Sequence, residues 1–396
     1  MRVIVNQQAT EGQKTGVGHY TSELVRCLRA LPGGPEIDCR PSLPDRLRRL
    51  WRRERPSTPP TPDAPRAPGL AARLKGAVLG RLRPLGHELY RRLGGLALAR
   101  GGYDLYHEPN FLPLPTGVPT VATIHDLSVL LYPQWHPAER VKRFEKYFRR
   151  GLDQCRHLIA VSASGRDEIV RTLGVPAARV TAIYNGVRPG LGPLPAGAVR
   201  EALARLGLPA SYLLHLGTVE PRKNVLTLLR AYCALPAALR SRHPLVLAGG
   251  WGWRAGDVAA YYQETARHRG AVHLGYVADA DLAALYGGAR ALAAPSWYEG
   301  FGLPPVEMLA CGGAVLASAI GPHKETCGGR AWLVEPGDEG GWHDALRRVL
   351  ADDGWWQGLR RGAAGAARPF TWDACAAATL HVYRAVVEGP PLRAAA

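Results

Sequence analysis

The sequence predicts an α/β protein of two domains, and three observations lead to this fold class. The chain has 396 residues, enough for two domains with substantial cores. Its 46 glycines and 33 prolines indicate many short connections between elements. Residues 291–319 combine a strand, a loop, a helix and a second strand, as in a βαβ unit with a right-handed crossover. A proline-rich linker at 189–195 separates residues 1–190 from a second domain that begins near residue 196.

The first domain alternates apolar runs with helical patterns. Between its first strand and first helix lies a glycine-rich loop, residues 12–20, in which Gly16 and Gly18 can bring backbone donors close to a ligand. Glycine loops are also common at tight turns without a ligand. Strands are expected at residues 3–5, 103–107, 118–124 and 157–161, and helices at 21–30 and 137–154. Residues 183–187, with a turn at Asn185 and Gly186, are expected to close this domain.

The apolar run at 118–124 is followed directly by His125 and Asp126. The carboxyl ends of parallel strands are where such sheets bind ligands. A histidine there can donate hydrogen bonds or shuttle protons, although a lone histidine is more often a structural residue. His125 and Asp126 are therefore candidate site residues.

Residues 40–102 have the most unusual composition in the chain. Arginines cluster between Arg46 and Arg55, a proline-rich segment follows, and residues 70–98 mix leucine and alanine with further basic residues. This basic insert suits an amphipathic helix that lies on a membrane surface. It also suits a helix packed on its own domain with its arginines outward, and the sequence leaves both interpretations open.

The second domain continues the alternation of strands and helices. Gly217 follows its first strand, and Arg222 and Lys223 stand at the start of the next helix, which ends near residue 233. Two cations beside free helix N–H groups can hold a diphosphate, although an adjacent basic pair is more often a solvated surface feature. Strands are expected at residues 212–216, 245–248, 272–274, 291–294, 314–317 and 332–334.

Two carboxylates lie in the 291–319 unit, Glu299 in its loop and Glu307 in its helix. Carboxylates accept hydrogen bonds from ligand hydroxyls, and backbone N–H groups near Gly302 and Leu303 can hold an anion. Sugar and phosphate would then meet in one pocket. Taken alone, such a pair is more often a solvated charge and a residue that favours a helix N-terminus.

The run YEGFGLP at 298–304, followed by EMLACG at 307–312, resembles the signature of the family 4 retaining glycosyltransferases of the GT-B fold. EPRKN at 220–224 is similar to a recurrent segment of the same family. TIHDL at 123–127 resembles its acceptor-domain segment, especially in bacterial mannosyl- and rhamnosyltransferases of surface polysaccharides. The resemblance covers nearly the whole chain outside the basic insert.

This resemblance implies two Rossmann-like domains that face a cleft, residues 1–190 for the acceptor and 196–369 for the nucleotide-sugar donor. Residues 370–396 resemble the terminal helix that crosses back to the first domain, with a tail. By the same resemblance, Glu299 contacts the donor sugar, Glu307 the ribose, and Lys223 with Arg222 the leaving diphosphate. His125 would lie beside the transferred sugar. Further donor contacts are implied for Gly217, Tyr276, Val277, Phe301, Gly302 and Leu303, and acceptor-side contacts for Gly16, Gly18 and Asp126.

The implied chemistry is transfer of a hexosyl group with retention of the anomeric configuration, with GDP-mannose as the leading candidate donor. We favour a front-face route over double displacement, because Glu299 is expected at the far hydroxyls of the sugar. No metal or other cofactor is expected, since family 4 enzymes generally work without a metal. Arg222, Lys223 and helix-end donors would stabilise the leaving group instead.

Composition suggests where the protein works. The seven cysteines show no close pairing and no metal-ligand spacing, which fits a reducing cytoplasm. The N-terminal residues lack the features of a signal peptide, and no apolar run reaches the length of a bilayer span. The formal charge of +17 has two explanations. It results from an arginine-rich composition alone, or it serves to attract the protein to an anionic membrane. No nucleic-acid-binding module is recognisable, so no nucleic acid partner is expected.

We therefore expect a peripheral enzyme at the inner face of the cell membrane. Its acceptor would be a saccharide, carried by polyprenyl diphosphate, in exopolysaccharide or O-antigen assembly. One alternative is transfer to a soluble sugar or sugar phosphate, and the basic insert argues against it. Another is a non-catalytic binding protein on the same fold. The pair Glu299 and Glu307 beside Arg222 and Lys223 argues against that alternative.

Overall fold

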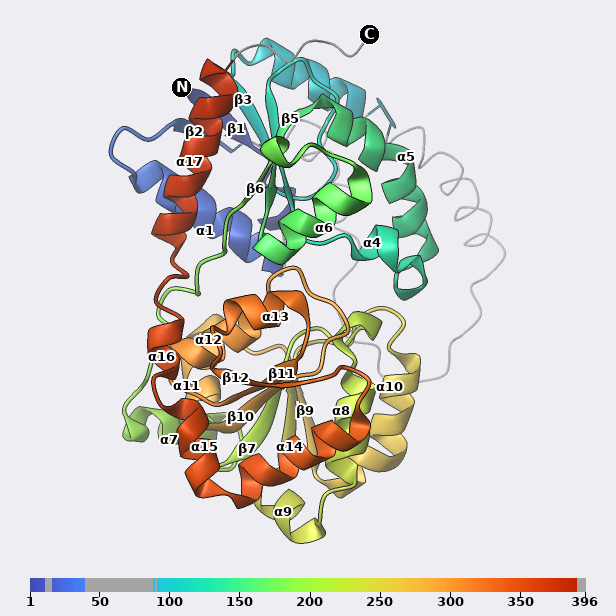
Figure 1. Ribbon diagram of the computed structural model, residues 1–396, viewed down its shortest axis with the longest axis vertical. Helices are drawn as coiled ribbons and strands as arrows, with labels where there is room; N and C mark the ends of the chain where they lie inside the picture. Colours follow the sequence, from blue (N-terminus) through green and yellow to red (C-terminus); the bar gives the residue numbers. More distant parts are fainter. Residues whose placement is uncertain (11–15, 40–87, 90, 390–396) are drawn as a thin grey trace. The chain divides into compact units, whose positions relative to one another are not determined.

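The computed structural model describes residues 1–10, 16–39, 88–89 and 91–389. The chain forms two compact units (Figure 1). The predicted domain boundaries near residues 190 and 196 lie between the last strand of one sheet and the first strand of the next. That these residues delimit two domains stays a prediction. One unit comprises Met1–Thr123, Tyr147–His157 and Leu380–Ala396, and the other comprises Ile124–Lys146 and Leu158–Thr379.

Two six-stranded sheets form the framework, with strand orders β2-β1-β3-β4-β5-β6 and β12-β11-β10-β7-β8-β9. Their strands pair in parallel, which confirms the predicted α/β class. The first sheet contains β1 (Arg2–Val5), β2 (Glu36–Asp38), β3 (Leu105–Glu108), β4 (Thr120–Ile124), β5 (Cys155–Ala160) and β6 (Val180–Ala182). The second contains β7 (Tyr212–Leu216), β8 (Leu245–Ala248), β9 (Ala271–Gly275), β10 (Ala289–Ala294), β11 (Val315–Ser318) and β12 (Ala331–Val334).

Residues 12–15 of the predicted glycine-rich loop lie outside the described residues, and residues 16–20 are helical, because the first helix begins at Gly16 and not near residue 21. Gly16 and Gly18 therefore lie in the first turn of α1, where the N–H groups have no partner within the helix. Tyr20 and Leu24 are buried on one face of α1, and this burial offsets the low helix propensity of the glycines. The helices between β1 and β6 are α1 (Gly16–Ala30), α4 (Ser128–Leu131), α5 (Ala138–Gln154) and α6 (Ala163–Leu173), with residues 91–100 also helical.

Residues 183–187, which were expected to close the first domain with a turn, follow the first sheet. The last strand of the first sheet is β6, three residues earlier in the chain. The Ile183 amide still donates to the Ala160 carbonyl, but the Val187 amide donates to the Phe370 carbonyl instead of to the sheet. This segment therefore leaves the sheet one residue after β6.

Most of the basic insert, residues 40–87 and 90, lies outside the described residues. In the helix at 91–100, Arg91 is buried and donates hydrogen bonds to the carbonyls of Leu112 (3.3 Å) and Pro113 (2.6 Å). Its guanidinium lies 4.4 Å from the centre of the Tyr147 ring. Arg91 therefore packs on its own unit. It does not point outward, in contrast to the interpretation of a packed helix with its arginines outward.

The C-terminal helix α17 (Trp372–Glu388) returns to the first sheet, as predicted. Its Tyr383 is buried, and the phenol lies 2.6 Å from His107 Nδ1 in β3. The other ring nitrogen of His107 lies 2.8 Å from the Thr123 hydroxyl, which lies 3.0 Å from the Tyr20 hydroxyl. This buried chain of hydrogen bonds joins α17, two strands and α1.

The second sheet has an apolar core on each face. Tyr212 and Leu214 of β7 lie in the core formed with α7, α11 and α12, and Leu213 lies in the core formed with α8, α9 and α14. Among the described residues, no helix has the length and apolar character needed to cross a bilayer. The helices of this region are α7 (Ala196–Arg205), α8 (Val225–Cys233), α9 (Ala237–Arg242), α10 (Gly256–Tyr261), α11 (Asp279–Gly288), α12 (Leu303–Ala310), α13 (Gly321–Thr326), α14 (Glu339–Ala351), α15 (Asp353–Arg360) and α16 (Ala363–Ala366).

Candidate functional site

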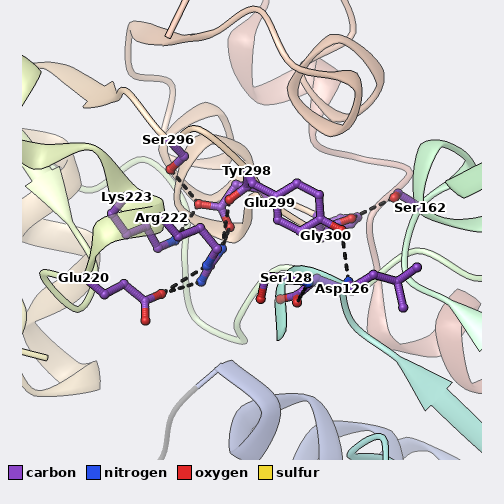
Figure 2. Close-up of polar contacts among 12 residues, drawn as sticks. Asp126, Ser128, Ser162, Glu220, Arg222, Lys223, Ser296, Tyr298, Glu299 and Gly300 are labelled. Atoms are coloured by element: carbon purple, nitrogen blue, oxygen red, sulfur yellow. Dashed lines mark hydrogen bonds and ion pairs between the residues drawn. The ribbon is translucent and has the colours of Figure 1, made fainter. Parts of the chain in front are cut away.

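The predicted site residue Glu299 is the centre of a charged cluster at the carboxyl end of the second sheet (Figure 2). It lies in the loop between β10 and α12. Its Oε1 accepts hydrogen bonds from Lys223 Nζ at 2.6 Å and from the Ser296 hydroxyl at 2.7 Å. Its Oε2 lies 2.5 Å from Arg222 Nη1. The two loops that carry the predicted donor residues are therefore joined through one carboxylate.

Arg222 and Lys223 lie on a short 3-10 turn, Pro221–Lys223, directly before α8. Arg222 also pairs with Glu220, whose Oε1 is 2.7 Å from Nη2, and donates to the Tyr298 carbonyl at 3.1 Å. Two cations and two carboxylates therefore balance within the cluster. Arg222 and Lys223, which the sequence predicts to bind a diphosphate, are therefore paired with Glu299 in the structure.

Burial and ion pairing act in opposite directions on the pKa of the Glu299 carboxyl. Burial alone would raise that pKa, but the charges of Arg222 and Lys223 outweigh burial and hold it well below its usual range. Burial would lower the pKa of Arg222, whereas Glu299 and Glu220 raise it above the usual arginine value. Glu299 and Arg222 are therefore ionised at neutral pH.

Two buried histidines flank this cluster, and the sequence analysis did not single them out. His215 at the end of β7 has Nδ1 3.0 Å from the Ala293 carbonyl, and His323 of α13 has Nδ1 3.1 Å from the Ser318 carbonyl. Within the part of the chain that the structure describes, both Nε2 atoms lack a hydrogen-bond partner. Burial lowers both pKa values, that of His215 to about 4, so both rings are neutral. A histidine in the apolar strand at 212–216 was the signal that could have revealed the first.

Gly302 occupies the N-cap position of α12 with a φ of +86°, a conformation that favours glycine. A Cβ at this position would lie 2.7 Å from Cδ2 of His323, so the imidazole fills the space of a side chain. The backbone N–H groups that follow Gly302, including that of Leu303, start the helix and have no partner within it. Phe301 is buried and packs edge-on against Phe370 at 5.6 Å, so its side chain belongs to the core.

Glu307, the second predicted carboxylate, is fully buried on α12. The Tyr286 hydroxyl donates to its Oε2 at 2.7 Å, and Arg188 Nε lies 3.2 Å from its Oε1. Burial raises the pKa of Glu307, while Arg188 opposes that shift. The sequence analysis missed Arg188, which also lies 3.7 Å from Asp279. Contact between Glu307 and a ribose therefore requires Arg188 to share or release this carboxylate.

The chain contains one Asp-x-Asp triplet, Asp279 to Asp281, at the start of α11. In many glycosyl-transfer sites such a triplet is a metal ligand, but here each carboxylate faces an arginine. Asp279 pairs with Arg188, and Asp281 lies 3.3 Å from Arg205. Across residues 1–10, 16–39, 88–89 and 91–389, no group of three or more histidine, cysteine, aspartate or glutamate side chains has the arrangement of a metal site.

The structure brings the His125–Asp126 segment to the Glu299 loop. A Cβ on Gly300 would lie 1.7 Å from the His125 carbonyl oxygen, so only glycine allows this approach. Asp126 Oδ1 accepts a hydrogen bond from the Ser128 amide at 2.8 Å. A cavity of about 350 Å³ opens here and is lined by His125, Asp126, Glu168 and residues 297–300 among others.

Three of the remaining predicted residues follow strands of the second sheet, and two belong to the first helix. Gly217 has a φ of +148°. A Cβ there would lie 3.6 Å from Cε of Lys223, so the aliphatic part of the lysine side chain packs against this glycine. Tyr276 is exposed and Val277 is buried in the loop after β9. Gly16 and Gly18 belong to the other compact unit, and their acceptor-side role stays a prediction.

Comparison with known proteins identifies the family of the chain. The Glycosyltransferase Family 4 model matches residues 14–191, and the model for glycosyl transferases group 1 matches residues 205–368. The chain is 32% identical to the O-antigen chain mannosyltransferase B of Escherichia coli, over 97% of this chain and 100% of that protein. It is 35% identical to a D-inositol 3-phosphate glycosyltransferase of Xylanimonas cellulosilytica, over 60% of this chain and 58% of the relative.

Solved structures of low sequence identity share the fold. Sucrose-phosphate synthase from Thermosynechococcus elongatus superposes with a TM-score of 0.69 at 22% identity and covers 98% of this chain and 100% of its own. Anabaena HepE in complex with UDP and glucose gives a TM-score of 0.69 at 18% identity, with coverage of 96% and 99%. These two have the GT-B architecture predicted from the sequence. The chain is thus a glycosyltransferase with the GT-B fold and belongs to family 4.

Proposed function

We propose that the protein transfers a mannosyl group from GDP-mannose to a saccharide acceptor in polysaccharide assembly, with retention of configuration. The observation that carries this proposal is the Glu299 cluster, in which Lys223 and Arg222 contact the loop that leads into α12. Two cations next to free helix N–H groups suit a diphosphate. Support for mannose comes from the full-length similarity to an O-antigen chain mannosyltransferase.

On this proposal, the leaving diphosphate draws Lys223 and Arg222 away from Glu299, whose carboxylate then accepts hydrogen bonds from sugar hydroxyls. Lys223, Arg222 and the first amides of α12 stabilise the charge that develops on the departing phosphate. That phosphate takes the proton of the acceptor hydroxyl on the same face of the sugar. On this proposal His125, whose carbonyl oxygen lies against Gly300, contacts the transferred sugar. No step assigned to these residues requires a metal.

The experiment that tests the function is a panel of nucleotide sugars incubated with the protein and a membrane-lipid acceptor fraction. We expect hexose incorporation and nucleoside diphosphate release from GDP-mannose, unchanged in excess EDTA because protein donors hold the diphosphate. A second arm with inositol phosphate covers the soluble acceptor class named in the relative from Xylanimonas cellulosilytica. Loss of activity in EDTA with recovery on adding magnesium would contradict the metal-free mechanism, and transfer only to inositol phosphate would contradict the polysaccharide acceptor.

We further propose that the acceptor is linked to polyprenyl diphosphate and that the protein reaches it at an anionic membrane surface. The formal charge of +17 supports this, as each basic residue near an anionic surface contributes on the order of 1 kcal/mol. Co-sedimentation with liposomes should therefore require anionic lipid and weaken as salt shortens the Debye length. Equal sedimentation with neutral and anionic liposomes, or none with either, would contradict membrane recruitment.

A further inference from the structure

Tyr298, which directly precedes Glu299, connects the Glu299 loop to two other segments. Its phenol donates a short hydrogen bond to Glu168 Oε2 on α6 and accepts one from the Leu127 amide at 2.9 Å (Figure 2 shows the phenol above the Asp126 segment). The Tyr132 ring packs against the Tyr298 ring at 5.4 Å. One hydroxyl thus holds a loop, a helix and the segment that follows His125.

The neighbouring contacts fix the same loop to the same helix. The Ser162 hydroxyl donates to the Gly300 carbonyl at 2.7 Å and also caps α6. Glu325 of α13 accepts from the Ala163 amide at 2.6 Å and the Ser164 amide at 3.0 Å. These contacts anchor the start of α6, so Glu168 is presented to Tyr298 from a fixed position.

Glu168 is a half-buried carboxylate that none of the functional assignments above uses. Burial raises the pKa of its carboxyl, and the hydrogen bond from Tyr298 partly offsets that rise. The charged groups that face it are Asp126, which adds to the rise, and Arg171, which opposes it. Among the groups that favour the ionised form of Glu168, the Tyr298 phenol has the largest effect on its pKa.

We propose that Glu168 and Tyr298, completed by the Leu127 amide, form a positioning pair that sets Glu299 and His125 for hexosyl transfer. This inference rests on the proposed function, since it concerns the geometry of that reaction. Glu299 directly follows Tyr298 in the chain, and Leu127 is two residues from His125. Because the Tyr298 phenol binds the Leu127 amide, it fixes the distance between Glu299 and His125. Neither Glu168 nor Tyr298 touches the reacting atoms, and both act through their neighbours.

The charge on Glu168 matters because a hydrogen bond to an ionised acceptor is stronger than one to a neutral acceptor. Protonation of Glu168 weakens the bond from Tyr298, and turnover then falls as pH falls through the raised pKa of Glu168. Glu168→Gln keeps the shape and a carbonyl acceptor but removes the charge. It should lower kcat about fivefold at neutral pH and remove this acid limb from the pH profile. Tyr298→Phe leaves the buried Leu127 N–H without its partner and should lower kcat about tenfold or more.

The test compares kcat, KM for GDP-mannose, the pH profile and Tm in both variants and in Glu168→Gln with Tyr298→Phe combined. Because the two residues share one hydrogen bond, the double variant should lose little more than Tyr298→Phe alone. KM for the donor should change less than threefold. A matched control is Tyr232→Phe, which removes another buried phenol, one with carbonyl contacts to Arg240 and Gly270. It should lower Tm without changing kcat, and Glu145→Gln, at an exposed position on α5, should change neither.

Each outcome decides between a positioning pair and a purely structural contact. Lower kcat with a lost acid limb in Glu168→Gln supports the positioning pair. Lower Tm with wild-type kcat and an unchanged pH profile in both variants overturns it. Absence of hexosyl transfer by the wild-type protein overturns the proposed function and this inference together, whereas transfer by the wild type and equal transfer by Tyr298→Phe overturns the inference alone.

Discussion

Glu299→Gln is expected to lower kcat on the order of 100-fold while nucleoside diphosphate binds as tightly as to the wild type or several times more tightly. On the proposed function the carboxylate orients the donor sugar as the glycosidic bond breaks, so its loss acts on the transition state. The same carboxylate neutralises Lys223 and Arg222 at 2.6 and 2.5 Å. Glutamine frees both cations for the diphosphate, and this explains the opposite sign expected for binding.

Glu307→Gln is the matched comparison, because it also replaces a buried carboxylate of the same loop–helix unit. On the proposed function Glu307 contacts the ribose, and in the structure its ion pair is with Arg188 and not with Lys223 or Arg222. Nucleoside diphosphate affinity should therefore fall in this variant. Steady-state kinetics and calorimetric titration of the nucleoside diphosphate separate the two variants. Equal loss of diphosphate affinity in both would contradict distinct roles for Glu299 and Glu307.

Lys223→Ala is expected to lower kcat/KM for the donor about 100- to 1,000-fold, which corresponds to about 2.7–4 kcal/mol of lost transition-state stabilisation. In the structure, Lys223 Nζ contacts only one end of Glu299, and Arg222 and Ser296 still satisfy that carboxylate after the substitution. The fold should therefore survive, with a modest change in Tm. Kinetics on the true donor within about threefold of the wild type would exclude Lys223 from the diphosphate site.

Local sequence patterns predicted the second sheet well. The predicted strands at 212–216 and 245–248 coincide with β7 and β8, and the helix that ends at Cys233 is α8. These elements are short apolar runs bounded by glycine or polar residues, so their limits are encoded locally. Local patterns did not indicate the partner of the Val187 amide, because the Phe370 carbonyl is far away in the chain.

The site was predictable where its residues lie in contiguous motifs. Glu299, Lys223 and Arg222 meet as the resemblance implied, but the sequence did not indicate that the cations are paired with Glu299 itself. The contact between Glu168 and Tyr298 could not be predicted, because it joins residues 130 positions apart on elements that no local pattern relates. Long-range side-chain contacts of this kind depend on the packed structure and not on a local pattern.

The most direct test of the diphosphate site is calorimetric titration of GDP in excess EDTA into the wild type, Lys223→Ala and Lys142→Ala. Lys142 is an exposed lysine of α5, so its replacement removes the same charge from the protein without touching the Glu299 cluster. We expect the wild type and Lys142→Ala to bind GDP alike and Lys223→Ala to bind at least about tenfold more weakly, as loss of one charge-assisted contact predicts. Equal GDP affinity in all three proteins would contradict the assignment of this cluster as the donor diphosphate site.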